Sequence, residues 1–316
     1  MSNKQHSKFM QIINHWLRVV ILLSIILLIL SILGIKQYKQ EKQANDNFYK
    51  TEKQYNTYGR FSNKFPGIVV LCYHRILPSN PLTHFAQKKS HNSQLHSFNV
   101  NENDFKYQMK YLKDHNINVI SIDQMMDLLN SKKPITKKYI VITFDDIDHT
   151  IVNNAIPTLE KYKFPFTLFI ATGKTHNYIE GSYLASWSDI NKINENPLCT
   201  VGLHTNNGHF QENGKPRLLT MTNKEFQEDC TASINALHKH LNRQPKNLYF
   251  APPYGAITQS ETNYINTQTP IKGIFSLDNN LNDKYRDNHI YDRLVVTNDV
   301  FANVKKWLSN PKHNDK

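Results

Sequence analysis

Short apolar runs rich in β-forming residues alternate with amphipathic stretches of helical period from residue 67 onward. Such runs fit strands that are buried on both faces, as in a parallel sheet. Their alternation with helices predicts an α/β fold, an irregular parallel (β/α) barrel with one hydrophobic core. The predicted strands span residues 67–74, 118–122, 139–142, 164–171, 200–204, 248–250, 273–277 and 293–296.

Helical stripes and capping signals mark the segments between these strands. We expect helices from residue 101, over residues 151–162, and in a long segment after Thr222. The long helix has an apolar stripe of Phe226, Cys230, Ile234, Leu237 and Leu241. Helix caps are predicted at Ser121 with Gln124, Ser186 with Asp189, and Thr222 with Glu225. Residues 78–97 are polar, and we expect an exposed loop there.

One segment near the N-terminus is apolar on every side. Residues 19–35 carry no charge and lie between Arg18 and Lys36, at the short end of a membrane span. Trp16 fits an interfacial anchor. The run is long for a cleaved signal peptide, and no A-x-A pattern follows it. We therefore expect a retained transmembrane signal-anchor, a tail over residues 1–18 and a polar stalk over residues 36–65.

Composition and charge narrow the class of partner. The chain has 316 residues and a formal net charge of +12, but its lysines are scattered and no nucleic-acid motif occurs. We therefore expect no nucleic-acid partner and at most weak attraction to an anionic cell envelope. Cys72, Cys199 and Cys230 are odd in number and lack C-x-x-C spacing. This argues against a disulfide framework and against a thiolate zinc site.

Residues able to bind a metal follow two of the predicted strands. Asp145 and Asp146 come after the strand at 139–142, and neighbouring carboxylates repel each other unless a cation or a proton intervenes. His204 ends the predicted strand at 200–204, and His209 lies in the loop that follows it. Two imidazoles and one carboxylate with an open position are a common catalytic zinc set. Taken singly, the first pair also fits a solvated turn and the second fits unrelated loop histidines.

A third stretch, Phe-Ala-Pro-Pro-Tyr-Gly at 250–255, forms a rigid turn after a further strand. In this order, Thr143-Phe-Asp-Asp146, His204-Thr-Asn-Asn-Gly-His209 and Ala251-Pro-Pro-Tyr254 resemble the motifs of the polysaccharide deacetylases of carbohydrate esterase family 4. The resemblance covers roughly residues 67–308. It implies a barrel of the polysaccharide deacetylase type over residues 66–309, followed by a tail at 310–316.

The chain departs from the usual motifs at three points. Ile147 stands where most members have glycine, the histidine pair is one residue wider, and Ala251 replaces the arginine that commonly orients the base. Together with Tyr73-His74-Arg75 and the anchor, these features are similar to the branch that acts on poly-β-1,6-N-acetylglucosamine. In that branch the barrel is circularly permuted, and the general-acid histidine comes from the first strand.

The resemblance implies metal-assisted hydrolysis of an amide. Asp146, His204 and His209 would hold one divalent cation, for which Zn²⁺ is expected and Co²⁺ or Ni²⁺ also fits. Asp145 would act as the general base. Asp148 and His149 are rival ligands, ranked lower because the motif assigns the metal to Asp146.

Four further residues complete the implied site. The backbone N–H of Tyr254 would hold the developing oxyanion, and His74 would protonate the leaving amine. Pro253 is expected to contact the substrate, and Trp187 is expected to do so from its residue type alone, as an apolar wall for the acetyl group or sugar ring. For His74 and Trp187, a place in the core is the alternative.

The resemblance also implies an exported N-acetylglucosamine polymer as substrate, with the polymer's synthase or export machinery as a candidate neighbour. We therefore expect a single-pass protein of the cell membrane, of the Gram-positive type, with its catalytic domain extracellular. Lysines flank both ends of the anchor, so charge alone does not orient it. Two alternatives are a peptidoglycan deacetylase and a catalytically inactive, membrane-tethered glycan-binding module.

Overall fold

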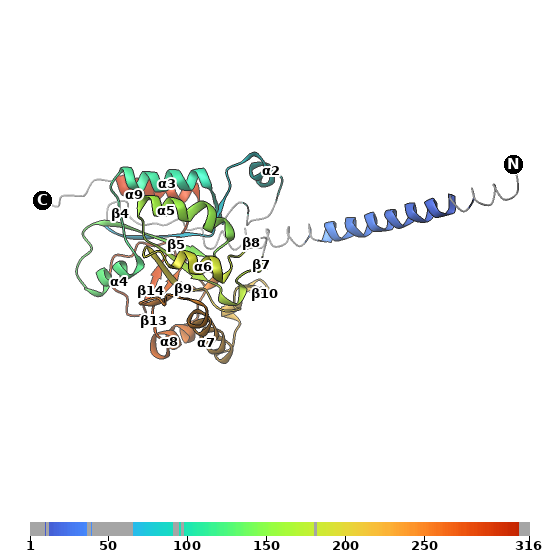
Figure 1. Ribbon diagram of the computed structural model, residues 1–316. Coiled ribbons are helices and arrows are strands. Elements are labelled where there is room, and N and C mark those ends of the chain that lie inside the picture. Colours follow the sequence, from blue (N-terminus) through green and yellow to red (C-terminus); the bar gives the residue numbers. More distant parts are fainter. Residues whose placement is uncertain are drawn as a thin grey trace. The chain divides into compact units, whose positions relative to one another are not determined.

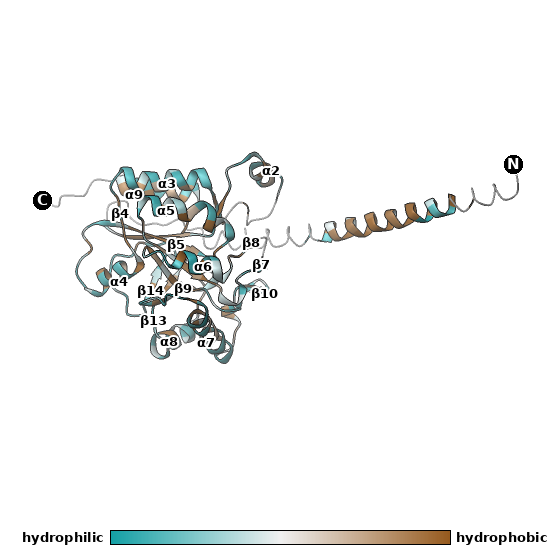
Figure 2. Ribbon diagram, viewed as in Figure 1, coloured by the Kyte–Doolittle hydropathy of each residue, from teal (hydrophilic) through white to brown (hydrophobic). Residues whose placement is uncertain are grey.

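The computed structural model describes residues 10, 13–36, 39, 66–90, 95, 98–179 and 182–309. The chain divides into two compact units, Met1–Lys50 and Thr51–Lys316. In the first unit a helix spans Ile13–Lys36, and its 24 residues could cross a membrane by length and composition. Figure 2 shows it as hydrophobic along most of its length. The predicted stalk lies almost wholly outside the described residues, and the tail at 310–316 lies entirely outside them.

Parallel strands of the second unit form a nearly closed barrel, which confirms the predicted fold class (Figure 1). The strand order is β14-β13-β12-β9-β6-β5-β1-β15, and β4 pairs with the start of β5. In chain order the strands are β1 (Gly67–Tyr73), β4 (Asn118–Val119), β5 (Lys138–Asp145), β6 (Phe166–Ile170), β9 (Cys199–Leu203), β12 (Leu248–Phe250), β13 (Ile271–Ser276), β14 (Ile290–Asp292) and β15 (Leu294–Val295).

The barrel is closed by one extended stretch, residues 290–295, which Arg293 divides into β14 and β15. Its first half pairs with β13 and its second half with β1, so it joins the two ends of the strand order. The backbone N–H of Arg293 donates to the Ser276 carbonyl, and that of Val296 donates to the Cys72 carbonyl. The side chain of Arg293 is fully buried inside the barrel.

Helices cover the barrel on two sides. Figure 1 shows α3 (Glu102–Asp114), α5 (Ile156–Tyr162) and α9 (Asn298–Ser309) together, with α7 (Asn223–His240) and α8 (Gln259–Gln268) on the opposite side. The remaining barrel helices are α4 (Ile122–Asn130) and α6 (Trp187–Asn194). The three predicted caps are confirmed as capping boxes, and Thr258 with Glu261 forms a further one that was not predicted.

The expectation of a loop over residues 78–97 is wrong in part. The helix α2 spans Pro81–Lys89, with the side chain of Asn80 accepting a hydrogen bond from the backbone N–H of Thr83. An Asn cap followed by proline at the first helical position is a helix start signal. None of its residues is buried, so the predicted exposure holds while the conformation does not. Residues 91–94, 96 and 97 of this stretch lie outside the described residues.

Short elements complete the unit. The segment Ile151–Ala155 before α5 is a π-helical turn, where a regular helix was expected. Single 3₁₀ turns span Thr172–Lys174, Arg217–Leu219 and Pro253–Gly255. Three small sheets pair β2 (Arg75–Leu77) with β3 (Asn99–Asn101), β7 (Tyr178–Ile179) with β8 (Ser182–Tyr183), and β10 (Gln211–Glu212) with β11 (Lys215–Pro216).

Candidate functional site

Three predicted ligands meet at the carboxyl ends of β5 and β9. The Oδ1 atom of Asp146 lies 3.2 Å from Nε2 of His209 and 3.6 Å from Nε2 of His204. A tetrahedral ion bound to oxygen and nitrogen at about 2.1 Å would separate such ligand atoms by about 3.4 Å. One ligand atom from each residue lies within 4.8 Å of the others. The spacing therefore fits a small divalent cation.

The ring of His204 is oriented by a carbonyl at the end of β12. Its Nδ1 lies 2.6 Å from the Ala251 carbonyl oxygen, so Nδ1–H donates and Nε2 is left with its lone pair. Burial lowers the pKa of His204 to about 4, although the nearby Asp145 and Asp146 oppose this shift. The imidazole is therefore neutral at pH 7, which is the form that binds metals.

The loop that carries His209 is fastened to helix α7. The carboxylate of Asp229 accepts hydrogen bonds from the backbone N–H groups of Asn206, at 2.8 Å, and Asn207, at 2.7 Å. Burial raises the pKa of Asp229, and these amide donors oppose that effect. The His209 ring lies 5.2 Å from the ring of Tyr254, measured between centroids. The position of the loop that carries His209 thus depends on the Asp229 carboxylate of helix α7.

The backbone turns sharply where β5 delivers Asp146. Asp146 and Ile147 both have positive φ, at 63° and 56°. A β-branched residue in this region is strained, by about 1–3 kcal/mol. The side chain of Ile147 is buried in the core, and its carbonyl accepts from the Ala185 N–H at 2.9 Å. These contacts hold the turn at the position where the family usually has glycine.

The neighbouring carboxylate, Asp145, has a different partner. Arg293 donates from Nη1 to Oδ1 at 2.6 Å and from Nη2 to Oδ2 at 2.8 Å. Burial alone would raise the pKa of Asp145, but Arg293 and His204 outweigh it and hold this pKa well below its usual range. Asp145 is therefore an oriented, ionised carboxylate beside the candidate metal ligands.

Sequence reasoning missed Arg293, because it expected the arginine in the third motif and found Ala251 there. The guanidinium also lies 5.1 Å from the centroid of the Phe169 ring. The available signal was a single charge next to the apolar run Leu294-Val-Val296 in a predicted strand. A charge in such a run requires a buried partner.

His74 follows β1 and approaches the same carboxylate. Cys72, His74 and Asp145 each offer a ligand atom within 4.8 Å of the other two. The His74 ring packs against Phe98, 5.0 Å away between centroids, and burial lowers the pKa of His74. Its Nδ1 atom is buried and has no hydrogen-bond partner among the described residues. The predicted acid and the predicted base are thus neighbours.

The remaining predicted residues lie at different distances from this group. Tyr254 has a positive φ of 59° and its ring packs beside His209, while Pro253 is buried in the same turn. The Trp187 ring instead stacks on His240 of α7, at 4.8 Å between centroids. The substrate contacts assigned to Pro253 and Trp187 stay predictions.

The two rival ligands are engaged elsewhere. Asp148 accepts from the backbone N–H of Thr150 at 2.8 Å, bonds the hydroxyl of Ser182, and lies 3.8 Å from Nε of Arg75. His149 contacts the side-chain amide of Asn153 at 3.0 Å. Neither belongs to the group formed by Asp146, His204 and His209.

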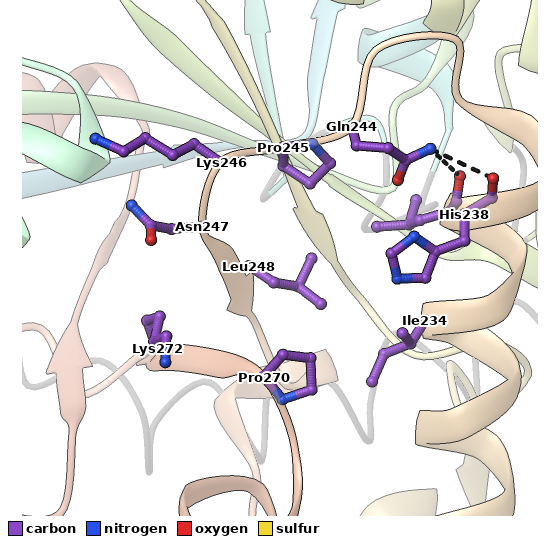
Figure 3. Close-up of a pocket in the computed structure, with 10 residues that line it drawn as sticks. Ile234, His238, Gln244, Pro245, Lys246, Asn247, Leu248, Pro270 and Lys272 are labelled. Carbon is purple, nitrogen blue, oxygen red and sulfur yellow. Dashed lines mark hydrogen bonds between the residues drawn. The ribbon is translucent and has the colours of Figure 1, made fainter.

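A separate pocket of about 200 Å³ lies where β12 and β13 begin, next to the C-terminal part of α7 (Figure 3). Its apolar lining includes Leu248 and Pro270, and Lys246 and Lys272 also line it. The Gln244 amide closes one side by donating to the Leu241 and His238 carbonyls. None of the predicted site residues lines this pocket, which lies at the opposite ends of the strands.

Comparison with known proteins gives concordant matches. The family model described as "Polysaccharide deacetylase" matches residues 132–272. Poly-β-1,6-N-acetyl-D-glucosamine N-deacetylase of Staphylococcus aureus (strain MRSA252) is 26% identical over 242 residues, which cover 76% of this chain and 82% of that protein. The protein of the same name from Staphylococcus epidermidis is 28% identical over 244 residues, with the same shares. The solved structure of IcaB from Ammonifex degensii has 30% identity and a TM-score of 0.67, covering 78% of this chain and 99% of that one.

Proposed function

The chain belongs to the polysaccharide deacetylase family, and on that basis we propose that it removes N-acetyl groups from poly-β-1,6-N-acetyl-D-glucosamine at the cell surface in a metal-dependent reaction. As a polysaccharide N-deacetylase it is a hydrolase of amide bonds. The Staphylococcus relatives are N-deacetylases of this polymer by name. The observation that carries the proposal is the ligand-like spacing of Asp146, His204 and His209 beside an Arg293-paired Asp145.

The protein's own residues divide the work. Asp146, His204 and His209 would hold the cation, which when bound polarises the acetyl carbonyl and acidifies a water. Asp145 accepts the proton of the attacking water. A carboxylate with a lowered pKa is a weak base. A weak base is sufficient here, because the bound cation would lower the pKa of the attacking water.

Residues around the Asp145 carboxylate carry out the remaining steps of the proposed reaction. Arg293 keeps Asp145 ionised and fixes its direction. The backbone N–H of Tyr254 would donate to the oxyanion as it develops, and His74 would donate a proton to the leaving amine. The products are acetate and a free amine on the sugar.

The N-terminal helix supports the proposed location. We assign residues 19–35 to a membrane anchor, residues 1–18 to a cytoplasmic tail, and residues 66–309 to an extracellular domain on a stalk. The helix Ile13–Lys36 is long enough for this role. An exported polymer can be reached only from that side of the membrane.

Amine release from defined oligosaccharides tests the proposal. The metal-loaded protein should liberate amines and acetate from β-1,6-linked N-acetylglucosamine oligomers, and a chelator should stop the reaction. Peptidoglycan fragments serve as the β-1,4-linked comparison. Faster release from those fragments would overturn the proposed substrate, and no release from either would favour a glycan-binding module.

A further inference from the structure

A second group of potential metal ligands lies beside the first and shares no residue with it. Cys72, His74 and Asp145 each place one ligand atom within 4.8 Å of the others. They stand at the ends of β1 and β5, which pair in parallel with Cys72 opposite Thr143. Cys72 and Asp145 are buried, and His74 is partly exposed. A small ion could therefore enter past His74.

The distances within this group fit coordination. Sγ of Cys72 lies 3.4 Å from Oδ2 of Asp145. A tetrahedral zinc with sulfur at about 2.3 Å and oxygen at about 2.1 Å would separate the two by about 3.6 Å. One ring nitrogen of His74 lies within 4.8 Å of the other two ligand atoms, and Nδ1 of His74 is buried without a hydrogen-bond partner among the described residues. Sulfur and imidazole together select thiophilic cations such as Zn²⁺, Co²⁺ or Cd²⁺ over Mg²⁺.

The charge around this group makes it the weaker of the two. Arg293 already donates to both oxygens of Asp145, although each carboxylate oxygen keeps a second lone pair. A cation here would face the guanidinium, whereas Asp146 is paired with His204 and His209 among the ion pairs of the described residues. The Asp146 group should therefore fill first.

We propose that Cys72, His74 and Asp145 form a second, inhibitory site for a thiophilic divalent cation. On binding, the Cys72 thiol releases its proton to solvent and its sulfur bonds the cation, with no change in oxidation state. Binding itself does not depend on the enzymatic activity. Its inhibitory effect rests on the proposed function, because the ion would occupy both the base Asp145 and the acid His74.

Cobalt titration of the full-length protein tests the site directly. The first equivalent should give only the weak visible bands of an oxygen and nitrogen site, since the Asp146 group has no sulfur. The second equivalent should add the near-ultraviolet charge-transfer band of a cobalt thiolate. Cys72→Ser should keep the first phase and lose the second.

Two matched variants control for the other thiols. Cys199 and Cys230 are also free and buried, but neither belongs to a group of potential metal ligands among the described residues. Cys199→Ser and Cys230→Ser should retain both phases. A thiolate band that survives in Cys72→Ser, is absent from the wild type, or vanishes in a control variant would refute the site. Loss of the first phase in Cys72→Ser would refute the independence of the two groups.

Measurements of turnover test the proposed inhibitory effect. Activity on the β-1,6 oligomers should rise with the first equivalent of Zn²⁺ and fall with excess. In Cys72→Ser the inhibiting concentration should rise at least about tenfold, while an unchanged concentration would overturn the inhibitory role. If every variant is inactive, the proposed function fails, and the thiolate band still decides whether the second site exists.

Discussion

The two adjacent carboxylates of the site have separate partners, and this separation supports the different roles proposed for them. Asp145 is paired with Arg293, whereas Asp146 faces the imidazoles of His204 and His209. A carboxylate bound to a guanidinium is a weaker ligand for a cation than a carboxylate that faces only imidazoles. We therefore expect Asp146 to be the ligand of the catalytic cation and Asp145 to accept the proton.

We expect Asp145→Asn to keep about one divalent ion per chain and to lose turnover by roughly two to four orders of magnitude. An amide preserves the shape of the side chain but cannot accept the proton. Asp146→Asn and His204→Ala should lose the ion, as measured by elemental analysis of purified protein. An Asp145→Asn protein without metal, beside an active Asp146→Asn protein, would reverse the two roles.

We expect Arg293 to set the acid limit of activity. Without the guanidinium, the strongest influence that lowers the pKa of Asp145 is removed, and this pKa rises because burial favours the neutral acid. A base with a raised pKa is protonated at higher pH, so the acid limb of the pH–rate profile of Arg293→Met should move to higher pH. Arg293→Lys keeps the positive charge and should stay closer to the wild type.

The same substitution affects stability. Breaking a buried pair costs about 3–5 kcal/mol, so the pH profile must be recorded where urea unfolding shows a native protein. The assignment fails if folded Arg293→Met keeps the acid limb of the wild type.

Asp229 tests whether the histidine loop is positioned from a distance. Asp229→Asn weakens the acceptor for the amides of Asn206 and Asn207, so affinity for the metal should fall by about 10–100-fold. Calorimetric titration with Zn²⁺ measures this effect. Its neighbour Glu228 is exposed and pairs only with Lys224 at 3.8 Å among the ion pairs of the described residues, so Glu228→Gln is the matched control. Equal metal affinities in the two variants would show that the hydrogen bonds accepted by Asp229 are not needed for metal binding.

Strands and helices of the barrel follow from local patterns, and so most of them could be predicted. The stripe of α7 and its Thr222 cap lie within a few turns of helix, where period and spacing are visible in the sequence. The convergence of Asp146, His204 and His209 could also be predicted, because strand ends of a parallel barrel meet at one rim. Helix α2 was missed although Asn80 and Pro81 signal its start. The signal for this helix lies in two adjacent residues, so it was available in the sequence.

Contacts between distant strands were harder to predict. The pair Asp145 and Arg293 joins residues 148 positions apart, and no period links them. The positive φ of Ile147 also could not be read from a β-branched residue, because tertiary contacts hold it there. The stack of Trp187 on His240 likewise depends on how α6 meets α7. Each of these features is set by packing.

At the scale of the whole chain, the proposed membrane topology can be tested directly. External protease on intact, wall-stripped cells should release a soluble, active fragment of domain size, because the proposed stalk would be exposed outside. The helix Ile13–Lys36 should remain in the membrane fraction. A domain that is protected until the membrane is broken would place it in the cytoplasm and remove the exported polymer as its substrate.

Closure of the barrel by residues 290–295 has a consequence for the order in which the molecule is made. A ribosome releases the metal ligands of β5 and β9 long before it releases Arg293, and the strand on either side of Arg293 joins β13 to β1. A nascent chain therefore carries the complete histidine and aspartate set while its barrel is still open and its base unpaired. For the membrane-anchored, exported enzyme proposed above, this makes catalytic competence a late event of biogenesis, reached only when residues 290–295 have crossed the membrane.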